Sequence, residues 1–182
     1  LVGSEMCIRD SRCWMPALRH LDLYDDIEIP EPPTLFDDYK DNIFAARKQE
    51  LEIDRHMHLN YDLFVDLTAD FPEQKVRTDK SAWQNMKRMT TEQMKTWRDA
   101  YGPRDKALHD AKLEGKDLVR WKFQRYAKNY LRCVKGVDEG IGKLMDTLEE
   151  LKIADNTIVI YSSDQGFYIG DHGWYDKRWM YD

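Results

Sequence analysis

The sequence predicts an α/β fold that is mostly helical, with few parallel strands within this chain. A long amphipathic helix is expected over residues 121–151, because apolar residues recur at intervals of three and four, at Tyr126, Tyr130, Val134, Val137, Ile141, Leu144, Leu148 and Leu151. Residues 157–161 (Thr-Ile-Val-Ile-Tyr) follow a polar turn. Such a short β-branched run predicts a strand buried on both faces of a parallel sheet. One strand cannot form a sheet, so we expect the other strands to lie outside this chain.

The composition indicates the size of the protein and excludes several classes. The 182 residues correspond to about one domain. Apolar residues make up 42% and aromatic residues 12%, which supports a packed core and argues against disorder. The 28 basic and 34 acidic residues give a net charge of −6, which argues against a nucleic-acid-binding module. No apolar run reaches the roughly 18–20 residues that span a bilayer, so no membrane span is predicted.

The first residues carry no targeting signal. Glu5, Arg9 and Asp10 interrupt the apolar stretch that a signal peptide requires. We expect residues 1–12 to be artefactual or disordered. Because the sequence lacks an initiator methionine and stops abruptly, we interpret it as an internal fragment of a longer protein.

Residues 13–40 are predicted to form an irregular linker segment. Three prolines at 30, 32 and 33 each remove a backbone donor and fix φ, which excludes a helix or a central strand. Asp37 and Asp38 follow an apolar pair and are expected to cap a helix that starts near Tyr39.

Residues 41–125 are predicted to form a helical insert. The composition favours a helix within 42–58 and another from a cap at Thr90 or Thr91 to residue 101, where a Gly-Pro pair should end it. The aromatic residues of the insert have two interpretations, packing in the core or stacking on sugar rings. They are Trp83, Trp97, Tyr101 and Trp121.

The motif with the most chemical information follows the predicted strand directly and reads Ser163-Asp164-Gln165-Gly166. Ligands of open α/β sheets bind beyond the carboxyl ends of the strands, where Asp164 and Gln165 would lie. A carboxylate and an amide oxygen are hard ligands that suit Ca²⁺, with Mg²⁺ as the alternative. Ca²⁺ takes about 6–8 oxygens, so other segments or a substrate must supply the rest. Alternatively, the motif is only a capped turn.

Two cationic or titratable residues lie further along the same glycine-rich loop. His172 stands between Gly170 and Gly173, and Lys177 follows shortly afterwards. Together with Asp164 they place a carboxylate, an imidazole and an ammonium on one loop, which can gather positive charge around an anion. The alternative is a solvated loop histidine and a surface lysine.

These motifs, taken in order, resemble the sulfatases of the alkaline-phosphatase superfamily. The resemblance covers residues 126–182 and rests on Val137-Asp138, Ile141-Gly142, Asp155-Asn156-Thr157, Ser163-Asp164-Gln165-Gly166, Gly170-Asp171-His172-Gly173 and Lys177. Residues 21–39 also resemble the mid-chain linker of bacterial sulfatases that act on sulfated glycans. The resemblance implies that 13–182 is part of a catalytic domain with an alkaline-phosphatase-like sandwich fold, in which 126–182 supplies a helix, a strand and the metal loop.

The resemblance also implies a role for each site residue. Asp164 would be a carboxylate ligand of a Ca²⁺ ion and Gln165 would occupy the neighbouring ligand position. Lys177 would contact the sulfate and His172 would line the pocket. The nucleophile of this family is formylglycine, made in a Cys-or-Ser-x-Pro-x-Arg motif that this sequence lacks. We therefore expect formylglycine in the missing N-terminal part and predict that this chain alone is inactive.

The function implied is that of a sulfuric ester hydrolase that removes sulfate from a carbohydrate or aryl sulfate ester. A phosphodiesterase or phosphonate hydrolase of the same superfamily is an alternative, because phosphate and sulfate are both tetrahedral oxyanions. A non-catalytic helical interaction module is another. The expected partner is a sulfated carbohydrate or other sulfate ester. The parent protein is expected in the periplasm or outside the cell, as is usual for sulfatases of this type.

Overall fold

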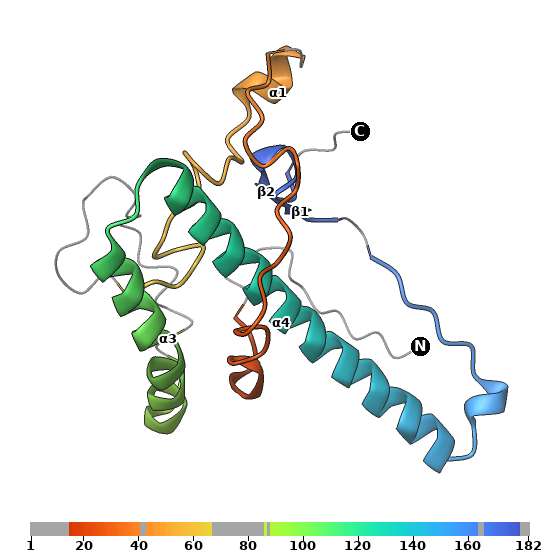
Figure 1. Ribbon diagram of the computed structural model, residues 1–182. Coiled ribbons are helices and arrows are strands. Elements are labelled where there is room, and N and C mark those ends of the chain that lie inside the picture. Colours follow the sequence, from red (N-terminus) through yellow and green to blue (C-terminus); the bar gives the residue numbers. More distant parts are fainter. Residues whose placement is uncertain (1–14, 41–42, 67–85, 87, 164–165, 179–182) are drawn as a thin grey trace.

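The computed structural model describes residues 15–40, 43–66, 86, 88–163 and 166–178 (Figure 1). In chain order the elements are η1 (Leu18–His20), α1 (Phe44–Lys48), α3 (Thr91–Ala111), α4 (Gly115–Glu150), η3 (Ala154–Asn156), β1 (Tyr168–Ile169), η4 (Asp171–Gly173) and β2 (Tyr175–Asp176). The chain is thus mostly helical, as predicted, but the sheet formed by the described residues is a small antiparallel hairpin, whereas parallel strands were expected. No helix among these residues is long and apolar enough to cross a bilayer.

Helix α4 is the long axis around which the other described segments are arranged (Figure 1). It covers the predicted range 121–151 almost entirely and begins six residues earlier, at Gly115. Its buried residues all come from the N-terminal half and are Val119, Lys122, Phe123, Arg125, Tyr126, Ala127, Asn129 and Arg132. That half packs into the main core together with residues 51–65 and the hairpin; the core comprises Leu35, Ile53, Met57, Leu59, Leu63, Val65, Leu108, Val119, Phe123, Tyr126, Ala127 and Tyr175.

Helix α3 begins at the predicted cap but runs further than predicted. Gln93 donates its backbone N–H to the hydroxyl of Thr90 at 3.2 Å, and Thr90 donates its own N–H to the Gln93 side chain at 2.9 Å, which forms a capping box. The helix continues through Gly102 and Pro103 to Ala111. Burial on both sides of the proline, at Trp97, Tyr101, Asp105 and Leu108, outweighs the hydrogen bond that proline removes.

The helix expected within 42–58 is confined to α1, and the following residues are irregular. Their backbone groups form hydrogen bonds with the hairpin instead of with one another. The N–H of Ile53 donates to the Gly173 carbonyl at 2.8 Å, and the Leu51 carbonyl accepts from the Tyr175 N–H at 2.9 Å. Glu52 and Trp174 form an antiparallel bridge. This pairing with the distant hairpin replaces the local helical ladder.

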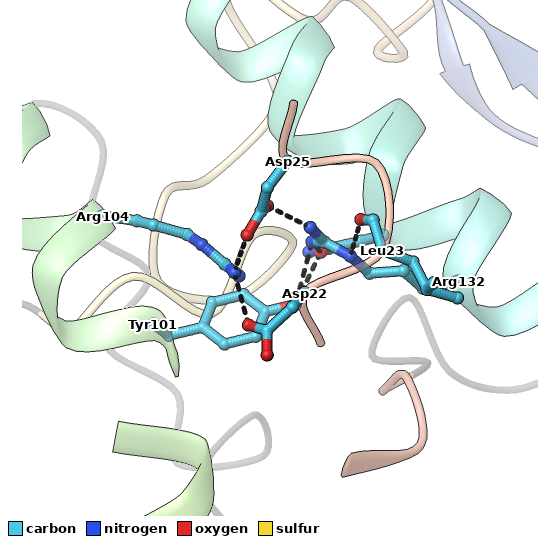
Figure 2. Close-up of polar contacts among 7 residues, drawn as sticks. Asp22, Leu23, Asp25, Tyr101, Arg104 and Arg132 are labelled. Atoms are coloured by element: carbon cyan, nitrogen blue, oxygen red, sulfur yellow. Dashed lines mark hydrogen bonds and ion pairs between the residues drawn. The ribbon is translucent and has the colours of Figure 1, made fainter. Parts of the chain in front are cut away.

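The predicted linker, described from residue 15 onward, is irregular apart from η1 and lies along α4. The Gln124 side chain accepts from the backbone N–H of Ile29 at 3.0 Å and donates to its carbonyl at 2.7 Å. Further along α4, Arg132 donates to the Leu23 carbonyl at 2.9 Å and pairs with Asp25 at 2.7 Å (Figure 2). Asp25 also pairs with Arg104 of α3, so one carboxylate joins the segment to two helices.

Strands β1 and β2 pair in an antiparallel hairpin, with Tyr168 opposite Asp176 and Ile169 opposite Tyr175. The strand predicted at 157–161 is not formed, and the prediction that it is buried is wrong for this structure. Ile158 and Ile160 are 89% and 84% exposed. A strand needs a hydrogen-bonded neighbour, and the described part of the chain offers none to this segment (Figure 1).

Candidate functional site

The loop predicted to carry the chemistry is described only in part. The predicted metal ligands Asp164 and Gln165 lie outside the described residues, so their role stays a prediction. The loop continues from Gly166 through the hairpin to Lys177. Among the residues that the structure describes, no group of three or more His, Cys, Asp and Glu could hold a metal ion. The chemistry of the donor set, one carboxylate and one amide oxygen, still suits a hard divalent cation.

The turn between the two strands requires both of its glycines. Gly170 has φ +94°, and a Cβ there would lie 2.8 Å from the Phe123 ring. Gly173 has φ +67°, and a Cβ there would lie 2.7 Å from the carbonyl oxygen of Leu35. Both positions combine a left-handed backbone with a close approach, so only glycine fits without displacing a neighbour. The Gly-Asp-His-Gly motif therefore specifies a turn that is packed against α4 and the linker.

His172 is held by the linker through three hydrogen bonds. Its Nδ1 lies 2.7 Å from a carboxylate oxygen of Asp37, and its backbone N–H donates to the Thr34 hydroxyl at 2.9 Å. Its carbonyl accepts from the hydroxyl of Tyr39. The hydrogen bond with His172 lowers the pKa of Asp37, although burial opposes it. A carboxylate only accepts, so Nδ1 carries the proton and the ring orientation is fixed.

The contact of Asp37 with His172 differs from the prediction, in which Asp37 and Asp38 cap a helix. The described residues 37–40 form no helix. Asp37 instead accepts from the backbone N–H of Tyr39 at 2.9 Å, and Asp38 accepts from that of Lys40 at 3.1 Å. These are local turns of the type that aspartate favours. The contact of Asp37 with a residue far along the chain left no periodic signal in the sequence.

Lys177 lies directly after β2, and its backbone is fixed by Asp176. Asp176 is buried, has φ +73°, and accepts the Lys177 backbone N–H on its own side chain at 2.8 Å. The half-buried lysine side chain turns back toward the start of the loop, where its ammonium lies 5.6 Å from the centre of the Phe167 ring. His172 is thus tied to the linker, whereas the Lys177 side chain contacts Phe167 at the open end of the hairpin.

The hairpin that carries these residues packs against buried and hydrogen-bonded neighbours. Trp174 is buried and stacks on Tyr39 with ring centroids 5.9 Å apart. Behind it, the ammonium of the fully buried Lys122 donates to the carbonyls of Ile53, Asp54 and Met57 at 2.9, 3.1 and 2.9 Å. Three donors meet three acceptors, which offsets the desolvation of the charge and fixes the segment that pairs with the hairpin.

Two of the four aromatic residues that were candidates for sugar stacking are buried inside the protein. Trp97 and Tyr101 are 2% and 1% exposed and stack on one another at 4.3 Å, so for these two the sugar-stacking interpretation is wrong. Trp121 is partly buried against the main core. Trp83 lies outside the described residues. Trp97 instead packs against Phe64, and the Tyr101 hydroxyl donates to the buried Asn129 side chain of α4 at 2.6 Å.

Comparison with known proteins places the fold and the loop in one family. The sequence matches the Sulfatase family over residues 53–180. It is 43% identical over 171 residues to N-acetylglucosamine-6-O-sulfatase of Bacteroides thetaiotaomicron, a match that covers 94% of this chain and 30% of that protein. It is 34% identical over 61 residues to human iduronate 2-sulfatase, which covers 33% of this chain and 11% of the relative.

A solved structure also resembles this chain. A protein in complex with its substrate, D-glucosamine-2-N,6-O-disulfate, matches with a TM-score of 0.82 and 40% sequence identity, covering 96% of this chain and 35% of that one. The chain therefore belongs to the sulfatase family and has its alkaline-phosphatase-like fold, as the motifs predicted. It spans about a third of the length of these two relatives.

Proposed function

We propose that the protein carrying this chain is a sulfatase that removes sulfate from a carbohydrate ester, and that this chain supplies the second half of its catalytic site. The observation that carries the proposal is the 43% identity to an N-acetylglucosamine-6-O-sulfatase along 94% of the chain. The relatives favour a sulfatase over a phosphoesterase or a non-catalytic helical module. We further propose that it acts in the periplasm or outside the cell.

The substrate class follows from the same relatives. One is named for a 6-O-sulfate on N-acetylglucosamine, and the solved structure holds a glucosamine sulfated at the 2-N and 6-O positions. We propose a glucosamine 6-O-sulfate ester as the substrate. Iduronate 2-sulfatase matches over 61 residues only and is a weaker guide.

Each site residue has a chemical task in this proposal. Asp164 and Gln165 would hold a divalent cation, Ca²⁺ by their donor chemistry, which when bound neutralises charge on the sulfate oxygens. The Lys177 ammonium would bind an oxygen of the sulfuryl group and stabilise the charge that develops there. His172, oriented by Asp37 at 2.7 Å, would line the pocket. The nucleophile, formylglycine, is expected outside this chain.

The test uses the full-length protein and glucosamine 6-O-sulfate as substrate. Asp164→Ala should abolish the metal-dependent hydrolysis, and Lys177→Ala should lower kcat by about 10²–10³-fold, the usual effect of removing one group that stabilises transition-state charge. The matched control is Asp146→Ala, which removes an exposed aspartate of α4. Full activity in Asp164→Ala would overturn the metal assignment. Faster hydrolysis of the matching phosphate ester than of the sulfate ester would overturn the sulfatase assignment.

A further inference from the structure

Phe167 and Lys177 flank the two strands of the hairpin at its open end. Tyr168 pairs with Asp176 and Ile169 with Tyr175, so Phe167 comes directly before the first paired residue of β1 and Lys177 directly after the last paired residue of β2. The extended pairing stops there, because Asp176 has φ +73°. The pairing of Tyr168 with Asp176 therefore brings the two flanking residues to the same end of the hairpin.

The side chains of Phe167 and Lys177 contact one another at this end of the hairpin. The Lys177 ammonium lies 5.6 Å from the centre of the Phe167 ring, which is within the range of a cation–π interaction. The negative face of an aromatic ring attracts the cation but forms no ion pair with it. An ammonium held in this way keeps its charge and its three donors for an anion, whereas a carboxylate partner would compete with that anion.

Helix α4 braces this end of the hairpin from two positions one turn apart. Tyr130 contacts Phe167, with ring centroids 5.8 Å apart and an angle of 44° between the planes. Tyr126 accepts the backbone N–H of Asp176 at 3.2 Å. Burial raises the pKa of Tyr130, in keeping with an apolar setting for the ring contact. Phe167 before β1 and Asp176 of β2 thus both contact α4, at positions one turn apart.

We propose that Phe167 is a positioning residue for Lys177, and that Tyr130 fixes the ring on which the ammonium is held. The inference rests on the proposed function, in which Lys177 binds the sulfuryl group. It adds that the π face of Phe167 restrains the ammonium at the open end of the hairpin. Phe167 touches neither substrate nor the reacting atoms in this proposal.

A spectroscopic test separates this inference from the proposed function. Lysines of the full-length protein are dimethylated with ¹³C, which keeps their charge, and the Lys177 signal is assigned by its loss in Lys177→Arg. The ring should shift this signal upfield, and the shift should disappear in Phe167→Leu but remain in Phe167→Trp. An unshifted signal overturns the inference. A shifted signal that does not respond to inorganic sulfate leaves the ring contact intact and counts against the proposed role of Lys177.

A kinetic test separates positioning from a structural or substrate-binding role. Phe167→Leu should lower kcat by about tenfold with little change in KM, the size expected when a partly desolvated cation–π contact is lost. Phe167→Trp and Phe167→Tyr should retain most of the rate, and Tyr130→Leu should give a smaller loss of the same kind. A rise in KM with unchanged kcat would instead place Phe167 against the substrate.

The control is a second phenylalanine with a lysine beside its ring. Phe44 of α1 has the ammonium of Lys48 at 5.9 Å from its ring centre and is 69% exposed. Phe44→Leu therefore removes a comparable contact and should leave kcat unchanged. A wild-type kcat in Phe167→Leu, or an equal loss in Phe44→Leu, would overturn the inference.

Discussion

The two halves of α4 have the same sequence pattern but different surroundings. Up to Arg132 the apolar stripe is buried under the linker, residues 51–65 and the hairpin. Beyond it, Val134, Leu144 and Leu151 of the same stripe are 44%, 51% and 63% exposed. The segment 157–161 that follows is exposed as well.

The difference shows what an amphipathic pattern specifies and what it leaves open. Apolar spacing identifies the face of a helix that will be buried, but not the segment that covers it. In the first half the covering segments are part of the described chain. In the second half the described residues leave much of the stripe exposed, and exposed apolar surface is typical of a contact face. The two sulfatase relatives that span most of the chain are about three times as long as it is.

The largest loss of stability is expected from breaking a buried ion pair in the N-terminal half of α4. Arg125 and Asp105 are 5% and 8% exposed and lie 2.9 Å apart. Arg125→Met would leave the Asp105 carboxylate buried without its cation and should lower the free energy of unfolding by about 3–5 kcal/mol. Burial already raises the pKa of Asp105 while Arg125 opposes the rise. Denaturant unfolding of the 182-residue chain measures the loss.

The corresponding change in the second half is Lys135→Met, which removes the partner of Asp138. That pair is exposed, at 40% and 68%, so the loss should stay below about 1 kcal/mol. Equal losses in the two variants would show that the halves do not differ as the structure describes. The double variant Arg125→Met/Asp105→Leu should recover part of the stability, because no charge is then left buried alone.

Two Gly→Ala substitutions, one in each region, should change the stability of the chain in opposite directions. Gly173→Ala places a Cβ 2.7 Å from the Leu35 carbonyl at φ +67° and should destabilise the chain by about 2–3 kcal/mol. Gly140 lies in the exposed half of α4 with nothing within 4 Å of a Cβ. Gly140→Ala should stabilise the helix by about 0.5–1 kcal/mol. Thermal unfolding should show a lower melting temperature for Gly173→Ala and a higher one for Gly140→Ala. A change in the same direction for both variants would contradict the difference between the two regions.

These contrasts also explain which parts of the structure the sequence predicts. The long helix and the cap at Thr90 follow from local spacing and side-chain chemistry, and the family follows from the motifs along residues 126–182. The glycines of the Gly-Asp-His-Gly motif indicate a loop, but not the tight turn of a hairpin. The contact of Asp37 with His172 and the pairing of residues 51–53 with the hairpin join distant parts of the chain, so no local pattern reveals them. The strand at 157–161 was predicted from composition, but a strand also requires a neighbour.

A smaller, pH-dependent effect is expected where the second half does have a partner. Glu139 accepts from Arg19 at 2.6 Å and lies 2.7 Å from His20 Nε2, and these contacts lower its pKa from 4.5 to about 2. A carboxyl with a lowered folded-state pKa adds stability above its ordinary pKa and loses it as the pH falls toward the folded value. Between pH 4.5 and about 2, the melting temperature of the wild type should therefore fall more steeply than that of Glu139→Gln.

The control for this pH dependence is Glu149→Gln, which changes an exposed glutamate of the same helix. The melting temperature of Glu149→Gln should depend on pH with the same slope as that of the wild type. Parallel curves for the wild type and Glu139→Gln would show that η1 is not held to α4 by this carboxylate.

The smallest effect in this chain is expected at the segment that the sequence predicts to be a strand. Ile158→Thr and Ile160→Thr change side chains that are 89% and 84% exposed, so each should alter the unfolding free energy of the 182-residue chain by no more than about 0.5 kcal/mol. In the full-length protein, where we expect neighbouring strands, the same changes should each cost about 1.5–3 kcal/mol, the usual value of burying an isoleucine. Equal, small effects in both proteins would mean that the segment stays exposed and that the buried-strand prediction is wrong for the whole protein as well. A large effect confined to the longer protein would show that the β-branched pattern correctly identified a buried strand whose neighbours lie beyond the residues described.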